Sequence, residues 1–128
     1  MSFEQGKAEG YQGLSVWQKG INYVEKIYRV TSAFPKEEMY GLISQMRRAA
    51  VSIPANIAEG YARRSDAEFA RFLLIAAGSS AELETHVIIA HRLSFITLAE
   101  SDEIMADTNE LGKMLHGMHR SITQRKAA

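Results

Sequence analysis

The stretch RRAAVSIPANIAEGYARR, residues 47–64, decides how this sequence folds. Its residues repeat at the spacing of a single helix, although a proline lies inside it. An arginine pair stands at each end of the stretch, and Pro54 lies near its middle. A proline within a helix removes one backbone donor and clashes with the carbonyl four residues earlier, here that of Ala50, at a cost of ~3 kcal/mol. The sequence therefore predicts a helix that is kinked at Pro54.

Two stripes run along this helix at spacings of three and four. The apolar stripe consists of Ile43, Met46, Ala50, Ile53 and Ile57. The polar stripe consists of Gln45, Arg48, Ser52, Asn56 and Glu59. A solvated helix face more often carries long side chains such as lysine and glutamate, whereas short polar groups need hydrogen-bond partners when covered. We expect another helix or a second subunit to cover the polar stripe, and plain solvation is the alternative.

Helical periodicity continues on both sides of this stretch and predicts four helices, over about residues 15–33, 35–59, 65–98 and 101–122. Gly60 is a plausible end for the second helix, and Ser65 with Glu68 has the spacing of a capping box at the start of the third. No window alternates as a strand does. The sequence therefore predicts an all-α fold, an antiparallel up-down-up-down four-helix bundle with a proline kink in helix 2.

Composition sets the broad class of the protein. Residues 1–13 are expected to be a flexible N-terminal tail, residues 14–122 the four-helix bundle, and residues 123–128 a basic C-terminal tail. The 15 basic residues balance the 15 acidic ones, so nucleic acid binding would need a local patch. The absence of cysteine fits a reducing compartment, and neither a signal peptide nor a membrane span is evident. We expect a cytoplasmic protein that does not enter a membrane.

The third helix carries a run of small residues, 76–81, beside its core positions. Gly78 costs ~1 kcal/mol relative to alanine, which suggests a close crossing by another helix, with ordinary packing inside the chain as the alternative. We also expect Glu82 to pair with Arg48, across helices or across subunits. The predicted oligomer or partner interface consists of Arg48, Ser52, Pro54, Asn56, Glu59, Gly78, Ser79 and Glu82.

The stretch QMRRAAVSIPANIAEGYARRS, followed by FARFLLIAAGSSAELET, resembles a known family. The family consists of bacterial four-helix-bundle proteins encoded in intervening sequences of 23S ribosomal RNA genes. Its pattern has a basic pair, a Ser-Ile-Pro-Ala-Asn-Ile-Ala-Glu-Gly core, a short basic turn, an Ala-Gly-Ser element and a Glu-Leu-Glu element. These fall here on residues 47–48, 52–60, 63–64, 77–79 and 82–84. The resemblance covers roughly residues 14–120.

This resemblance implies an antiparallel four-helix bundle that assembles as a ring-like homopentamer. A related fold occurs in the accessory variability proteins of diversity-generating retroelements, which bind nucleic acid and a reverse transcriptase. The location of the family's genes suggests an association with RNA or ribosomes. The resemblance therefore implies a fold and an oligomer more directly than an activity.

Catalytic and metal-binding patterns are weak in this sequence. His116 and His119 stand three apart, and Glu82 and His86 four apart, so either pair could supply two metal ligands. A di-metal site in a bundle needs Glu-x-x-His on two helices, and this chain has none. His91 lies on the expected core stripe of the third helix. We expect no catalytic residue, no metal and no cofactor.

Basic residues gather near the junction of the second and third helices and along the last helix. The expected nucleic acid contacts are Arg47, Arg63, Arg64, Arg71, Lys113 and Arg120. Repeated around a ring, they would form a multivalent, salt-sensitive surface for a phosphate backbone. Tyr61 could stack on a base, or it could pack over the turn.

These observations predict a non-enzymatic, homo-oligomeric helical bundle that acts as a binding or scaffold protein, with RNA or ribosome association through its basic residues. The first alternative is an adaptor whose polar seam binds only a partner protein. The remote alternative is an enzyme that uses Glu59 or Glu82 of the seam as a general base.

Overall fold

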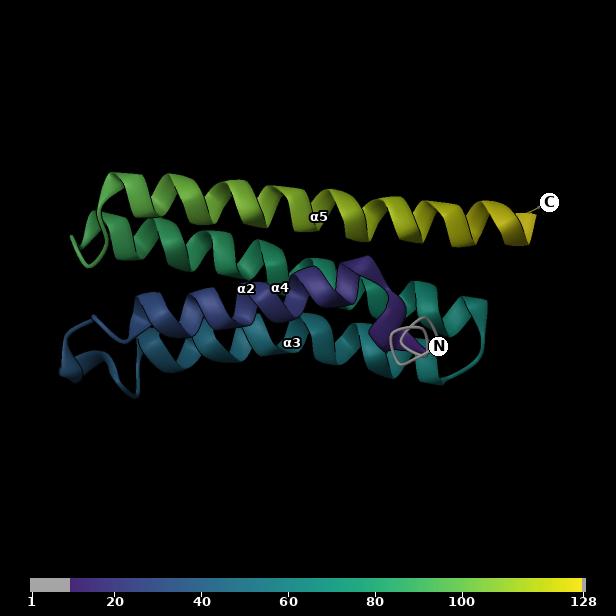
Figure 1. Cartoon of the computed structure of the whole chain (residues 1–128), viewed down its shortest axis with the longest axis horizontal. Coiled ribbons are helices and arrows are strands. Elements are labelled where there is room, and N and C mark those ends of the chain that lie inside the picture. Colours follow the sequence, from purple (N-terminus) through teal and green to yellow (C-terminus); the bar gives the residue numbers. More distant parts are fainter. Residues whose placement is uncertain (1–9, 128) are drawn as a thin grey trace.

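The computed structural model describes residues 10–127, with side chains up to residue 125. Its long helices are α2 (Ser15–Thr31), α3 (Leu42–Ala62), α4 (Asp66–Arg92) and α5 (Leu98–Ala127), and its short 3-10 helices are η1 (Tyr11–Gly13) and η2 (Lys36–Glu38). Residues 10–127 contain no strand, so the predicted all-α class with four long helices is confirmed. Figure 1 shows the four helices lying side by side, each beginning near the end of the one before it.

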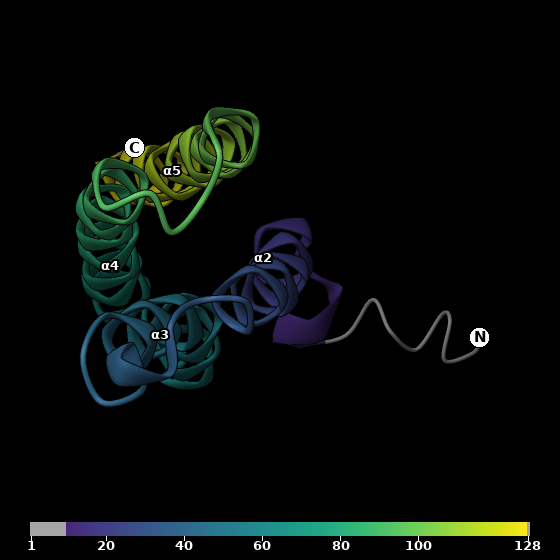
Figure 2. The ribbon, with the colours of Figure 1, turned by 90° about the vertical axis from the view of Figure 1, so that its left-hand side faces the viewer.

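The helices surround one apolar core. Seen along the bundle, α5, α4, α3 and α2 follow one another around an arc, so that α2 and α5 stand at its two ends (Figure 2). Every member of the predicted apolar stripe on α3 is buried. The largest side chains that are fully shielded from solvent include Ile27, Met46, Ile53, Ile57, Leu73, Leu83, Ile104, Leu111 and Leu115.

Helix α3 differs from its predicted range at both ends. It begins at Leu42 rather than Pro35, because residues 36–38 form the separate helix η2 and the Glu38 carboxylate accepts a hydrogen bond from the Leu42 amide at 3.2 Å. It ends at Ala62, two residues after Gly60, so Gly60 lies inside the helix. Arg64 makes the turn instead, with a left-handed φ of 57°.

Gly60 lies at a close approach of α3 to α4. A Cβ atom placed on Gly60 would lie 2.5 Å from the Cβ of Phe72 and 3.2 Å from the ring of Phe69. Real Cβ atoms do not approach one another so closely, so any side chain at this position would push the two helices apart. Packing, rather than termination of the helix, is the reason for a glycine at this position.

The turn between α4 and α5 also falls earlier than predicted. Helix α4 ends at Arg92, and Ser94 turns the chain with a φ of 64°. Helix α5 begins at Leu98 because Thr97 caps it: the Thr97 hydroxyl accepts from the Glu100 amide at 3.1 Å, and the Glu100 carboxylate accepts from the Thr97 amide at 2.9 Å. Half of the predicted capping box of α4 is present: the Ser65 hydroxyl accepts from the Glu68 amide at 3.3 Å, whereas the Glu68 carboxylate pairs with Arg63 and Arg71.

The ends of the chain are partly helical. Helix η1 lies within the expected N-terminal tail, and its Tyr11 packs edge-on against Trp17 at 5.4 Å between ring centroids. Residues 1–9 of that tail lie outside the described residues. Helix α5 continues through residues 123–127 of the expected C-terminal tail.

Pro54 lies inside α3 and faces α2. It is buried, and a Cβ atom placed on Gly20 of α2 would lie 3.4 Å from the Pro54 Cβ. Since 3.4 Å is an ordinary van der Waals distance, the proline ring and Gly20 pack directly against each other between the two helices. A bend of α3 at this residue stays a prediction.

Polar side chains join α2 to α5 across the two ends of the arc. Lys26 reaches Glu103 at 2.8 Å and Asp107 at 2.5 Å, and Lys19 reaches Glu110 at 3.1 Å and Asp107 at 3.8 Å. Long side chains with complementary charges therefore span a boundary where the two helices have few close backbone contacts.

Tyr23 of α2 is buried at this boundary, where it faces Thr108 of α5. The Thr108 hydroxyl donates to the carbonyl of Ile104 at 2.7 Å, so the Tyr23 hydroxyl donates to the Thr108 oxygen. Burial of the phenol disfavours its charged form and raises the pKa of Tyr23 above its usual value. Hydrogen bonds to Asp107 and Glu103 raise the pKa of Lys26.

We predict that Gly60→Ala lowers the free energy of unfolding by about 1–3 kcal/mol, because the added methyl group overpacks the contact with Phe72. Denaturant titration of the purified variant measures the change. Gly112→Ala is the matched control, since a Cβ atom there meets no atom within 4 Å, and it should raise stability by up to about 1 kcal/mol through helix propensity. Equal effects of the two substitutions would contradict the close approach.

We predict that ionisation of Tyr23 couples unfolding to alkaline pH. The folded protein holds the Tyr23 proton more tightly than the unfolded chain, so this stabilisation is complete below about pH 10. Above that pH the free energy of unfolding should fall by about 1.4 kcal/mol per pH unit until the folded state also ionises. Tyr23→Phe should remove this part of the slope in denaturant titrations at several pH values, and an unchanged slope would refute the coupling.

Candidate functional site

The middle of the predicted polar stripe is satisfied inside the chain. The hydroxyls of Ser52 on α3 and Ser79 on α4 lie 2.8 Å apart in a hydrogen bond. The Asn56 amide donates to both the carbonyl and the hydroxyl of Ser52, each at 2.8 Å. All three side chains are half-buried. These residues therefore line the contact between α3 and α4.

The charged members of the predicted interface lie on the rim of this contact and are exposed. Arg48 donates to the Ser44 hydroxyl at 3.1 Å, and Glu59 pairs with Arg63 at 3.0 Å. The Glu82 carboxylate lies 3.7 Å from the ring of His86. Within the described part of the chain, the expected pair between Arg48 and Glu82 is not formed.

The outer face of α4 is apolar and exposed. Leu74 is 47% exposed, Ile75 41%, Ile88 46% and Ile89 40%. Gly78 lies between them, and a Cβ atom placed there meets nothing within 4 Å, so no contact within the described residues requires a glycine. In Figure 2 α4 stands in the middle of the arc, opposite α2. We use the name outer face of α4 for Leu74, Ile75, Gly78, Ala81, Ile88 and Ile89.

Sequence reasoning missed most of this face, although a signal was present. The core stripe of α4 runs through Leu73, Ala76 and Leu83, while Leu74 and Ile89 fall on the opposite side of the helix. Among residues 10–127, α4 is the one helix that is long and apolar enough to cross a membrane by length and composition, a test that core helices of soluble proteins also pass. The helix therefore has apolar residues on two sides.

Arg47, a predicted nucleic acid contact, instead joins α3 to α2. Its Nε donates to the Thr31 hydroxyl at 2.9 Å, and its guanidinium lies 4.4 Å from the centre of the Tyr28 ring. A cation above an aromatic face is attracted to the ring electrons. Much of the hydrogen-bonding capacity of Arg47 is thus used within the chain.

Arg63 and Arg71 form ion pairs beside the turn between α3 and α4. Both pair with Glu68, at 3.5 Å and 3.2 Å, and Arg63 also pairs with Glu59. Their guanidinium groups lie 5.0 Å and 4.6 Å from the centre of the Phe72 ring. These arginines cover the edge of the close contact between α3 and α4, and their charges are largely balanced there.

Lys113 and Arg120 line a groove between α4 and α5. The groove has a volume of about 600 Å³, and His116 and Glu84 also line it. Small residues, among them Ala81 and Gly112, form its sides. The structure therefore brings the two predicted basic residues of α5 together with His116 on one surface.

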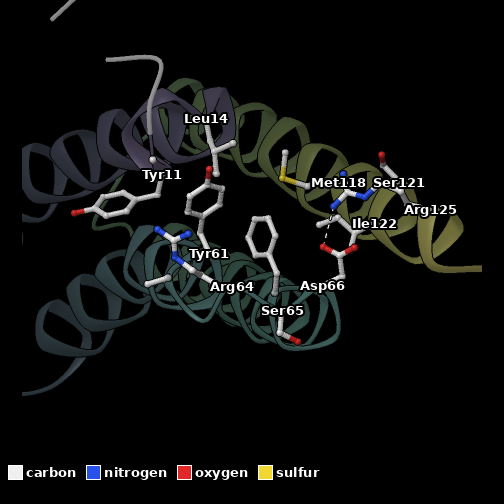
Figure 3. Close-up of a pocket in the computed structure, with 13 residues that line it drawn as sticks. Tyr11, Leu14, Tyr61, Arg64, Ser65, Asp66, Met118, Ser121, Ile122 and Arg125 are labelled. Atoms are coloured by element: carbon white, nitrogen blue, oxygen red, sulfur yellow. Dashed lines mark hydrogen bonds and ion pairs between the residues drawn. The ribbon is translucent and has the colours of Figure 1, made fainter. Parts of the chain in front are cut away.

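Arg64 lines a second, larger pocket beside the turn between α3 and α4. This pocket has a volume of about 840 Å³ (Figure 3). Three segments form the pocket: residues 10–14, the turn after α3, and the last part of α5. Tyr11 and Tyr61 line it, and Asp66 pairs with Arg125 across it at 2.9 Å. Tyr61 also packs edge-on against Phe69 at 5.6 Å. Sequence reasoning named Arg64 and Tyr61 but did not place them in a pocket.

The four histidines lie on α4 and α5. Within the described residues, no three His, Asp or Glu side chains lie close enough together to hold a metal ion. His86 is buried and its Nδ1 has no hydrogen-bond partner in that part of the chain, whereas His91, expected in the core, is half-buried. The distance between Glu82 and His86 suits a weak ion pair when the ring is protonated.

Comparison with known proteins agrees with this architecture. A protein of unknown function from the S23 ribosomal protein family of Bacteroides thetaiotaomicron VPI-5482 has a similar crystal structure, with a TM-score of 0.76 and 26% identity. The match covers 82% of this chain and 95% of that one. No curated protein matches the chain.

The family model described as 23S rRNA-intervening sequence protein matches residues 12–117, which include all of α2, α3 and α4 and most of α5. This match spans the Ser-Ile-Pro-Ala-Asn-Ile-Ala-Glu-Gly core and the close contact of α3 with α4. The chain therefore belongs to the 23S rRNA-intervening sequence protein family.

Proposed function

We propose that this protein is a homo-oligomeric scaffold whose copies associate through the outer face of α4. The observation that carries the proposal is the exposure of Leu74, Ile75, Ile88 and Ile89 around Gly78. These residues extend over about 22 Å of helix at 1.5 Å per residue. Contiguous exposed apolar surface with a polar rim is typical of interaction sites.

Gly78 supports a close approach by another copy. Glycine inside a helix costs about 1 kcal/mol relative to alanine, and nothing within the described residues fills the space beside it. A glycine among apolar neighbours allows another backbone to come near. The exposed Arg48 and Glu82 carry opposite charges on the neighbouring rim, so Arg48 of one copy can pair with Glu82 of the next copy around a ring.

A second copy is favoured over an unrelated protein as the occupant because the rim carries both charge signs. A surface that binds a single acidic or basic partner would carry an excess of one sign. A ring of five copies is the assembly that the family resemblance implies. In this proposal the protein is cytoplasmic, the helices keep an up-down-up-down order, and Pro54 bends α3 toward α2.

We predict that Ile75→Glu combined with Ile89→Glu reduces the oligomer to a monomer of 14.3 kDa, as measured by light scattering on the purified protein. Ile75 is 41% and Ile89 40% exposed in the single chain, so the variant should still fold, which denaturant titration checks alongside the molar mass. Tyr40→Glu, at a residue that is 96% exposed, is the control and should keep the molar mass of the wild type. A monomeric wild type would overturn the proposal.

Gly78→Ala tests whether another copy packs closely against α4 at this glycine. The added methyl group should raise the stability of the single chain by about 1 kcal/mol and weaken the oligomer at the same time. Opposite changes in stability and assembly separate an interface residue from a structural one. An alanine variant that assembles like the wild type would exclude close packing at Gly78.

RNA binding is the second function that we propose. The shared groove lined by Lys113, His116 and Arg120 favours it, since none of these side chains has a carboxylate partner within the described residues. The family name and the name of the Bacteroides protein's family both refer to the ribosome or its RNA. The adaptor that ignores nucleic acid is the alternative that the test below separates from RNA binding.

We predict that Lys113→Glu combined with Arg120→Glu weakens binding to duplex RNA and lowers the slope of log affinity against log salt by about two, one for each lost phosphate contact. Fluorescence anisotropy at several salt concentrations measures both quantities. Arg29→Glu combined with Lys36→Glu makes the same change in net charge at the other end of the bundle and should leave the slope unchanged. If the wild type binds no RNA at low salt, RNA binding is excluded, and the adaptor that binds only a partner protein is favoured.

A further inference from the structure

A pocket lies between the N-terminal segment, the turn after α3 and the end of α5. Its volume of about 840 Å³ falls within the range of small-molecule and cofactor sites, about 300–1,000 Å³. Its lining is mixed: Leu14, Phe69 and Met118 are apolar, whereas Arg64 and Ser121 are polar. A ligand that fits it has a flat apolar part and a charged part.

Aromatic rings supply the surface for the flat part. Tyr61 is 39% exposed, and its edge-on contact with Phe69 fixes the orientation of its ring. Tyr11 lines the same pocket from the other chain segment and is held against Trp17. Figure 3 shows Tyr11 and Tyr61 on different segments of the pocket wall. Planar bases stack on such rings with little sequence preference.

The charge of the pocket comes from Arg64. Asp66 and Arg125 neutralise each other at 2.9 Å, which leaves the Arg64 guanidinium as the unbalanced charge among the lining residues. Arginine recognises phosphate through paired hydrogen bonds. Arg64 also holds a left-handed φ of 57°, a conformation that costs energy for residues other than glycine, asparagine or aspartate. The turn thus carries arginine where glycine would suit the backbone better.

We propose that this pocket binds one nucleotide unit, with the base against Tyr61 and Tyr11 and the phosphate on Arg64. The inference deepens the RNA-binding part of the proposed function and rests on it. The nucleotide comes either from a single RNA strand or from a free mononucleotide, because both present the same base and phosphate. Duplex RNA offers no free base and contacts the α4–α5 groove instead.

The test uses the full-length protein, a fluorescein-labelled oligouridylate, free UMP, and a duplex of the oligouridylate with its complement. Arg64→Gly should weaken binding of the single strand or of UMP about tenfold, while the backbone at this turn accepts glycine without strain. Ser94→Gly is the matched control, because Ser94 has a similar φ of 64° in the turn between α4 and α5. It should bind like the wild type.

Tyr61 supplies a second readout that separates stacking from charge. Tyr61→Leu should weaken the same binding about tenfold, and Tyr61→Phe should retain it, because phenylalanine keeps the ring. Displacement of the oligouridylate by UMP at similar concentrations identifies a single-nucleotide site within strand binding. Binding of UMP without binding of the strand identifies a free mononucleotide as the ligand, and both results support the pocket.

The two proposals fail in different ways. If Arg64→Gly and Tyr61→Leu bind the strand and UMP like the wild type, the pocket proposal is overturned, while a loss of duplex binding in the Lys113→Glu, Arg120→Glu variant still supports RNA binding. If the wild type binds neither RNA nor UMP, both proposals are overturned.

Discussion

The close contact between Gly60 and Phe72 is the constraint on which the rest of the structure depends. With no side chain on Gly60, α3 and α4 approach one another beside the turn that joins them. Farther along the same interface, the two helices are close enough for the hydroxyls of Ser52 and Ser79 to form a hydrogen bond at 2.8 Å. The outer side of α4 in this pair carries the exposed apolar residues around Gly78.

Much of the fold could be predicted from the sequence because buried apolar residues repeat with the helical period. The stripe through Met46, Ile53 and Ile57 is fully buried, and the cap at Ser65 is present. The helix ends were less predictable. A glycine can end a helix or admit a neighbour, and only the position of Phe72 in space shows that Gly60 does the second.

The candidate site was harder to predict because local charge does not show which partners a side chain finds in space. Arg47 and Arg63 look alike in the sequence, yet one lies over Tyr28 and the other pairs with two carboxylates. The exposed apolar residues of α4 stand directly beside core positions in the sequence, so their composition alone does not separate an outer face from a core face. Arg64 and Tyr61 share a pocket only because residues from the two ends of the chain complete it.

The packing of Tyr11 against Trp17 has an optical consequence. Trp17 is the single tryptophan in the chain, so all of the indole emission comes from one place. Its ring is half-buried and touches the tyrosine that lines the large pocket. A change in the position of Tyr11 alters the surroundings of that indole directly. The protein therefore carries its own intrinsic fluorophore beside the pocket, and the wavelength of its emission reports on the state of that end of the bundle without any added label.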